Sequence, residues 1–183
     1  MTKDNLNFRI ATLDDAEKIQ QLVQEAFRAE DSRQDWTGNV ELARAFTVKV
    51  EDIITTMAKP NNEFLLATEE NNTPICCVGA SERENSHARL FMLAVDDRYQ
   101  RQGLGRQVIT YAEGYCQRTW NSEVIELDAL STRPQLIRWY MRCGYQQTGE
   151  TKPFPRAIFK ELELPQDLCF IELEKRLDTK PID

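Results

Sequence analysis

The chain has 183 residues, of which 41% are hydrophobic and 29% charged, and its formal net charge at pH 7 is −7. This length favours one compact domain over residues 1–183, because it can bury on the order of 70% of the surface that the unfolded chain exposes. The acidic balance argues against nucleic acid as the main partner, since phosphate backbones need a basic surface, and no apolar run approaches the ~20 residues of a membrane span.

Thr12 and Asp15 form a capping-box-like start for the first predicted helix. Residues 29–39 interrupt the helical pattern and are expected to form a loop, and a second helical region ends before Pro60. The apolar residues of the first helix recur at the spacing of one helical face: Ala16, Ile19, Leu22, Val23, Ala26 and Phe27.

Two strands are predicted next, over residues 63–68 and 74–81, with the polar residues 69–73 forming a hairpin turn between them. Cys76 and Cys77 are adjacent in the second strand, so their side chains should point to opposite faces. The chain has five cysteines, an odd number without the spacing of zinc ligands. We therefore expect no metal site and a reduced, cytoplasmic location.

The most informative segment is an apolar strand over residues 90–95 that leads through a polar loop to Gly103, Gly105 and a helix. Glycine lets the backbone approach a ligand closely, so that successive N–H groups can converge on an anion. The positive end of the helix dipole lies at the same place, and Arg101 and Arg106 can add charge-assisted hydrogen bonds. This arrangement predicts a ligand that contains several phosphates.

Spacing separates the kinds of phosphate-binding turn. A P-loop requires G-x-x-x-x-G-K-[ST], and no glycine of this chain is followed by lysine. A dinucleotide-binding turn requires G-x-G-x-x-G/A, but Val108 stands at the closing position and the glycines come seven residues after Asp96 rather than directly after the strand. The pattern Q/R-x-x-G-x-G/A does fit, over residues 100–105.

The helix over residues 104–118 is expected to connect the strand over residues 90–95 to a strand over residues 123–130. Such a crossover is right-handed and makes the two strands parallel. The rest of the sheet is expected to be antiparallel.

The last part of the chain is predicted to contain a helix through Tyr140, which Ser131 or Thr132 can cap. Residues 148–164 are interrupted by prolines and are expected to be irregular. Residues 168–177 are predicted to form the final strand.

These features resemble the GNAT superfamily of acyl-CoA-dependent N-acetyltransferases. The resemblance rests on the glycine pattern at residues 100–105, on the strand and helix start over residues 8–16, and on residues 139–145, where a tyrosine stands four residues before a glycine. It implies an α/β (α+β) fold: a mixed, mostly antiparallel twisted sheet with a central parallel strand pair splayed at the cofactor, flanked by helices.

The resemblance implies an enzyme that moves the acetyl group of acetyl-CoA directly to a primary amine. Tyr140 is then the expected general acid for the leaving thiolate, since a phenol and a thiol differ in pKa by an amount that costs only about 2 kcal/mol. The cofactor is expected to contact the central strand and the glycine turn, at Leu93, Ala94, Val95, Arg101, Gln102, Gly103, Leu104, Gly105 and Arg106.

For the general base we name Glu82, which lies at the end of the strand next to the central one. In some relatives a carboxylate base stands where this chain has Arg89, and an asparagine stands where this chain has Arg133. His87, the only histidine, lies among residues that are typical of a turn. The other carboxylates that could accept the proton of the amine are Glu84, Glu126, Asp128 and Glu150.

The resemblance places the acceptor cleft between the first two helices and a late loop. Acidic groups beside Trp36 would suit a cationic amine, through charge pairing and a cation–π contact. The expected partners are acetyl-CoA and a small amine, without nucleic acid or membrane, and a homodimer stays open. Two other functions also stay open, a non-catalytic acyl-CoA-binding or regulatory domain and an acetyltransferase for protein N-termini or lysines. The residues implicated in the cleft are Asp31, Asp35, Trp36, Phe154 and Arg156.

Overall fold

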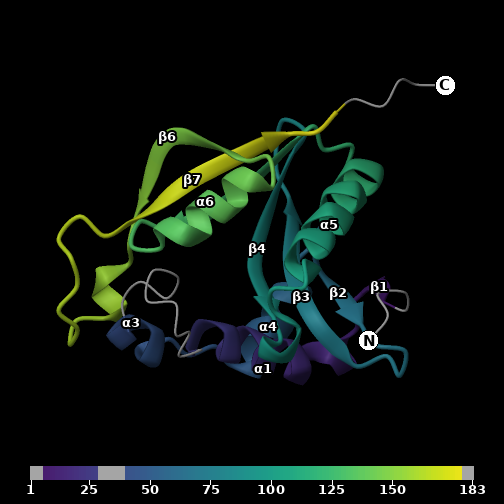
Figure 1. The fold of residues 1–183 in the computed structure, drawn as a ribbon, viewed down its shortest axis with the longest axis horizontal. Helices are drawn as coiled ribbons and strands as arrows, with labels where there is room; N and C mark the ends of the chain where they lie inside the picture. The colour runs from purple at the N-terminus through teal and green to yellow at the C-terminus, as the bar shows by residue number, and fades with distance from the viewer. Residues whose placement is uncertain (1–5, 29–39, 179–183) are drawn as a thin grey trace.

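The computed structural model describes residues 6–28 and 40–178 (Figure 1). The expected segment over residues 29–39, which includes Asp31, Asp35 and Trp36, lies outside the described residues. The elements in chain order are β1 (Asn7–Ile10), α1 (Ala16–Arg28), α3 (Val40–Ala45), α4 (Val50–Met57), β2 (Asn62–Thr68), β3 (Pro74–Glu82), β4 (His87–Val95), α5 (Leu104–Trp120), β5 (Val124–Leu130), α6 (Pro134–Arg142), β6 (Gln146–Pro153) and β7 (Cys169–Arg176).

The seven described strands form a single mixed sheet in the order β1-β2-β3-β4-β5-β7-β6. The pair β4 and β5 is parallel and is connected by α5, while the other neighbouring strands are antiparallel. This confirms the predicted fold class. The parallel pairing is short, because it covers only residues 87–89 of β4 and 124–126 of β5. Beyond it the pairing between the two halves of the sheet stops, and in Figure 1 β4 and β7 run in diverging directions.

Helices cover both faces of the sheet. On one face α5 and α6 pack on the strands in a large apolar cluster, and on the other face α1 and α4 form a second one. Cys76 belongs to the first cluster and Cys77 to the second, and both are fully buried. The two adjacent cysteines therefore point to opposite faces, as predicted. β3 is buried on both faces at all but its last residue, which accounts for its largely apolar sequence.

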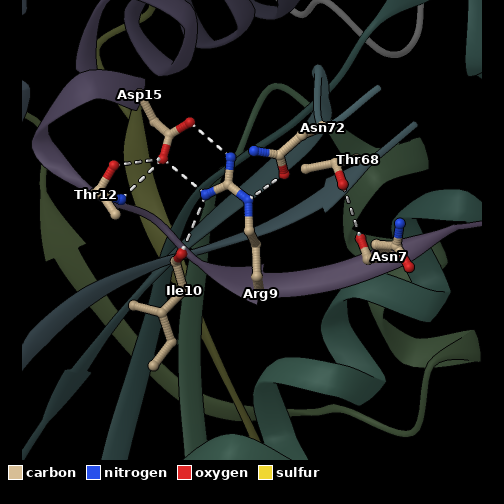
Figure 2. A network of polar contacts seen from close by, with 7 residues as sticks. All are labelled: Asn7, Arg9, Ile10, Thr12, Asp15, Thr68 and Asn72. Carbon is tan, nitrogen blue, oxygen red and sulfur yellow. Dashed lines mark hydrogen bonds and ion pairs between the residues drawn. The ribbon is translucent and has the colours of Figure 1, made fainter. Parts of the chain in front are cut away.

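Arg9 and Asp15 connect β1 to the start of α1, as Figure 2 shows. The Asp15 carboxylate accepts hydrogen bonds from both terminal nitrogens of Arg9, at 2.7 and 2.8 Å, and from the backbone N–H of Thr12, at 2.8 Å. The predicted capping box is present. These bonds, that to Arg9 above all, lower the pKa of Asp15, because they stabilise the charged form.

Two local predictions were wrong. β6 begins two residues before the segment expected to be irregular, residues 148–164, and extends into it. It pairs with β7 at the sheet edge although all eight of its residues are exposed. Neither Ser131 nor Thr132 caps α6, because Arg133 stands at the N-cap, and the hydroxyl of Ser131 accepts the N–H of Cys169 instead. The turn predicted around His87 forms at Asn85 and Ser86, and His87 itself follows it as the first residue of β4. Within the described residues, no helix combines the length and the apolar character needed to cross a membrane.

Candidate active site

A β-bulge alters β4 beside the place where β5 leaves it. Cys77 of β3 lies opposite Ala94, but Gly79 lies opposite Phe91, so β4 has one extra residue in this interval. Met92 has a positive φ of 49°. A bulge bends a strand and increases its twist. Residues 90–95 therefore turn away from β5, and their backbone groups on that side are not used in the pairing of β4 with β5.

A cavity of about 360 Å³ lies where β4 and β5 diverge. Phe27 and Phe46 line it from the face covered by α1, whereas Ile109 and Tyr140 line it from the face covered by α5 and α6. The cavity thus opens the sheet to both faces. Two substrates can meet in such a space after entering from opposite sides.

The glycine turn at the start of α5 offers free backbone donors. Gly103 is the N-cap of α5 with a left-handed φ of 80°, and no atom lies within 4 Å of where its Cβ would stand. The first N–H groups of a helix have no partner within it, and the first turn of α5 has neither a side-chain cap nor an acidic residue. These donors fit an anion such as the diphosphate of coenzyme A.

The other residues predicted to contact the cofactor differ in how they are placed. Leu104 is buried in the core, so it can contribute only through its backbone. The Arg106 guanidinium donates a hydrogen bond to the carbonyl of Arg142 at the end of α6, and Gln102 donates to the carbonyl of Arg98. Their side chains are therefore held by the protein itself, which leaves backbone N–H groups and the exposed Arg101 as the donors nearest to the turn.

Tyr140 lies on α6 with 7% of its surface exposed and lines the cavity. Burial raises the pKa of its phenol to about 12, an effect that Asp128 increases and Arg133 opposes. The phenol is therefore protonated at neutral pH and can donate a proton. The raised pKa also makes this phenol a weaker acid than an ordinary tyrosine. Proton transfer from it to a thiolate of ordinary pKa costs about 5 kcal/mol, instead of about 2 kcal/mol for an ordinary tyrosine.

The ring of Tyr145 packs against the ring of Tyr140. Their rings meet edge to face with centroids 6.1 Å apart, and the hydroxyl of Tyr145 donates to the carboxylate of Glu113 at 2.9 Å. Lys175 of β7 donates to the same carboxylate at 2.7 Å. This buried group was missed from the sequence. The signal that could have found it is a glutamate on the apolar face of α5, between Ile109 and Cys116.

The structure separates Glu82 from this cavity. Glu82 lies at the end of β3, opposite Ala88, and its carboxylate accepts a hydrogen bond from Asn61 at 2.6 Å. Val95, which leads to the glycine turn, lies seven residues further along β4, a distance of about 23 Å at the usual rise of a strand. The register of β3 and β4 therefore places Glu82 at the wrong end of β4 to meet Tyr140.

The carboxylate that lies with Tyr140 is Asp128 of β5, which lines the same cavity. It forms an ion pair with Arg89 of β4. Two further candidate carboxylates do not line this cavity. Glu126 contacts His87 at 2.5 Å, and Glu150 is exposed on β6. In the late segment Phe154 lines the cavity, while Arg156 donates to backbone carbonyls of residues 165 and 166.

A diverging parallel strand pair beside a free helix N-terminus is the arrangement expected for an acyl-CoA-dependent acyltransferase. The sequence profile described as "Acetyltransferase (GNAT) family" matches residues 17–145, and the chain belongs to that family. It is therefore an acetyl-CoA-dependent acyltransferase. Among curated protein sequences, none matches this chain significantly.

Several solved structures share the fold. The ribosomal-protein-S18-alanine N-acetyltransferase from Escherichia coli has a TM-score of 0.69 at 16% identity, over 97% of each chain. The spermidine N-acetyltransferase from Vibrio cholerae, in complex with CoA and spermine, has a TM-score of 0.68 at 13% identity, over 95% of this chain and 96% of that one. YncA from Salmonella typhimurium, solved with its cofactor acetyl-CoA, has a TM-score of 0.67 at 16% identity, over 98% of each.

Proposed function

We propose that the protein transfers the acetyl group of acetyl-CoA directly to the primary amine of a small molecule. The observation that carries this proposal is the cavity between β4 and β5, which is lined from both faces of the sheet and contains Tyr140 and Asp128. An acyl thioester is already activated, so the site needs no covalent nucleophile. It must hold the two substrates together, stabilise the oxyanion and move two protons.

Acetyl-CoA is assigned to the side of α5. The backbone N–H groups around Gly103 and Gly105 would bind its diphosphate, helped by the dipole of α5 and by Arg101. Backbone groups of Leu93, Ala94 and Val95 would bind the arm that carries the thioester, because β5 does not use them. Structures of similar fold that contain CoA or acetyl-CoA support this assignment.

Tyr140 is assigned as the general acid. The amine nitrogen attacks the carbonyl carbon of the thioester, the carbon–sulfur bond breaks, and the phenol proton of Tyr140 passes to the departing sulfur. Burial keeps the proton on the phenol until that moment, because it raises the pKa of Tyr140 to about 12. The positive charge of Arg133 works in the opposite direction and makes the transfer easier.

Asp128 is assigned to the amine side in place of Glu82. The attacking nitrogen must lose a proton, and a carboxylate in the same cavity can accept it directly or through water. Arg89 holds this carboxylate in position across the two strands. Arg89 on β4 stands where some relatives have a carboxylate base. In this chain that position therefore holds the ion-pair partner of the proposed base, Asp128 on β5.

Two measurements on the intact protein test this function. Isothermal titration with acetyl-CoA should detect binding at a single site, and a thiol-reactive dye should detect coenzyme A released when an amine is added. Binding without release for any amine or peptide would favour a non-catalytic acyl-CoA-binding domain. Release with peptides bearing a free N-terminus or lysine, but not with small amines, would favour a protein acetyltransferase.

A further inference from the structure

We propose that the acceptor is a monoamine carried on an apolar, aromatic group. This inference rests on the proposed function and specifies its acceptor. It comes from the lining of the cavity. On the side of α1, and on the side of the segment that follows β6, aromatic side chains make up much of this lining.

The first aromatic wall belongs to the N-terminal half of the chain. Phe27, at the end of α1, stacks on Phe46, which follows α3, with ring centroids 4.3 Å apart and an angle of 21° between the rings. Both rings line the cavity. Gln24 and Arg28 hold the segment after α3 in place, since both donate side-chain hydrogen bonds to the carbonyl of Phe46.

The second aromatic wall belongs to the C-terminal half. Phe154 contacts Phe159 and Phe170, with ring centroids 5.4 and 5.8 Å apart. All three line the cavity, and Phe154 also packs with Leu42 of α3 and Leu168 in a small apolar cluster. Aromatic walls of this kind favour a planar apolar ligand, because ring pairs add to the free energy gained by burying apolar surface.

The described part of the lining offers one carboxylate to an ammonium group, that of Asp128. Among the described residues that line the cavity, only Asp128 and Arg133 are charged, and Asp128 already pairs with Arg89. A polyamine would bring two or more cationic nitrogens into this surface, and each needs a partner when it leaves water. A monoamine brings one nitrogen, and that nitrogen is the one that reacts beside Asp128.

The size of the cavity agrees with a small acceptor. At about 360 Å³ it lies at the lower end of the range for small-molecule sites, and the thioester of acetyl-CoA occupies part of the same space. A single ring on a short alkyl chain is the acceptor that these walls fit best.

The experiment compares three amines on the intact protein with acetyl-CoA: phenethylamine, ethylamine, which lacks the ring, and spermidine. Coenzyme A release gives kcat/KM for each. We expect phenethylamine to exceed both others by at least about tenfold, from the burial of its ring. A higher kcat/KM for spermidine, or equal values for phenethylamine and ethylamine, would overturn the inference.

Two variants test whether the ring of the acceptor binds in this cavity. Phe154→Ala removes one wall, and Ala43→Phe fills the cavity from α3 without shortening a core residue. Both should lower the ratio of kcat/KM for phenethylamine to that for ethylamine by about tenfold. Ile158→Ala is the matched control, because Ile158 lies in the same late segment but is 74% exposed and does not line the cavity. An unchanged ratio in Ala43→Phe would contradict the assignment even if Phe154→Ala fails to fold.

The outcomes separate a failure of the aromatic acceptor from a failure of the proposed acetyl transfer. If coenzyme A is released with spermidine or ethylamine in preference to phenethylamine, the proposed acetyl transfer stands and the aromatic acceptor is wrong. If acetyl-CoA binds but none of the amines releases coenzyme A, transfer to small amines is wrong, and the inference is wrong with it.

Discussion

Arg89 of β4 reaches past its register partner on β5, Glu126, and forms an ion pair with Asp128, two residues further along. Glu126 is the last residue of β5 that pairs with β4, so the ion pair spans the point where the two strands begin to separate. It therefore fixes a carboxylate at the entrance to the space between the strands.

Asp128→Asn should lower kcat/KM for amine acetylation by about 100-fold, because the amide cannot accept the proton of the amine. The dissociation constant for acetyl-CoA should be unchanged, since Asp128 lies on the amine side. Glu126→Gln is the matched control on the same strand, as Glu126 contacts His87 and does not line the cavity. Equal losses in the two variants, measured by coenzyme A release, would remove Asp128 from the proposed mechanism.

Tyr140→Phe should lower kcat by about 100-fold while leaving acetyl-CoA binding nearly unchanged, because it removes a proton donor and little surface. Since the pKa of Tyr140 is about 12, the residue stays protonated across the working range of pH. The ratio of wild-type to variant kcat should therefore be constant between about pH 6 and 9. A ratio that falls with a midpoint inside this range, or an unimpaired variant, would be inconsistent with Tyr140 as the acid.

Gly103→Ala should weaken acetyl-CoA binding by about tenfold or more, because a side chain would stand beside the N–H groups that bind the diphosphate. Gly149→Ala is a closely matched control. Gly149 has a φ of 87° against 80° for Gly103, and neither has an atom within 4 Å of the added Cβ. Both variants should lose a similar free energy of unfolding, about 1 kcal/mol. Isothermal titration that shows equal weakening in both would argue against the glycine turn as the binding site.

Asp15→Asn should lower the free energy of unfolding by about 2 kcal/mol at pH 7, because it breaks the bonds to Arg9 and Thr12. The folded protein depresses the pKa of Asp15, so its contribution is complete above the unfolded pKa of about 3.9 and is lost as the pH falls through the lower folded value. Urea unfolding of wild type and variant should thus converge toward pH 2. The exposed neighbour gives the control Asp14→Asn, and a difference that persists undiminished at low pH would exclude this origin.

The parts of the fold that the sequence predicts best are those with a local pattern. The strand, glycine turn and helix around Gly103 follow from glycine spacing and apolar periodicity, and the opposite orientation of Cys76 and Cys77 follows from the alternation of a strand. β6 has no such pattern, because an exposed edge strand buries no face and its residues are polar. Only its pairing with β7 makes it a strand.

The sequence alone could not favour Asp128, the proposed base, over Glu82, for a different reason. Glu82 and Asp128 both lie on strands next to or near β4, and residue type does not distinguish them. Their positions differ because β3 is antiparallel to β4, which places Glu82 opposite Ala88, whereas β5 is parallel and carries Asp128 toward the diverging end. Register is a property of the assembled sheet, so the choice requires the structure.

The central claim is that acetyl-CoA bound at the glycine turn presents its thioester in the cavity between β4 and β5. The most direct measurement is a crystal structure of the protein with coenzyme A. The claim predicts the diphosphate on the N–H groups around Gly103 and Gly105, with the sulfur within hydrogen-bonding reach of the Tyr140 hydroxyl. A diphosphate bound elsewhere, or a sulfur outside the cavity, would contradict it.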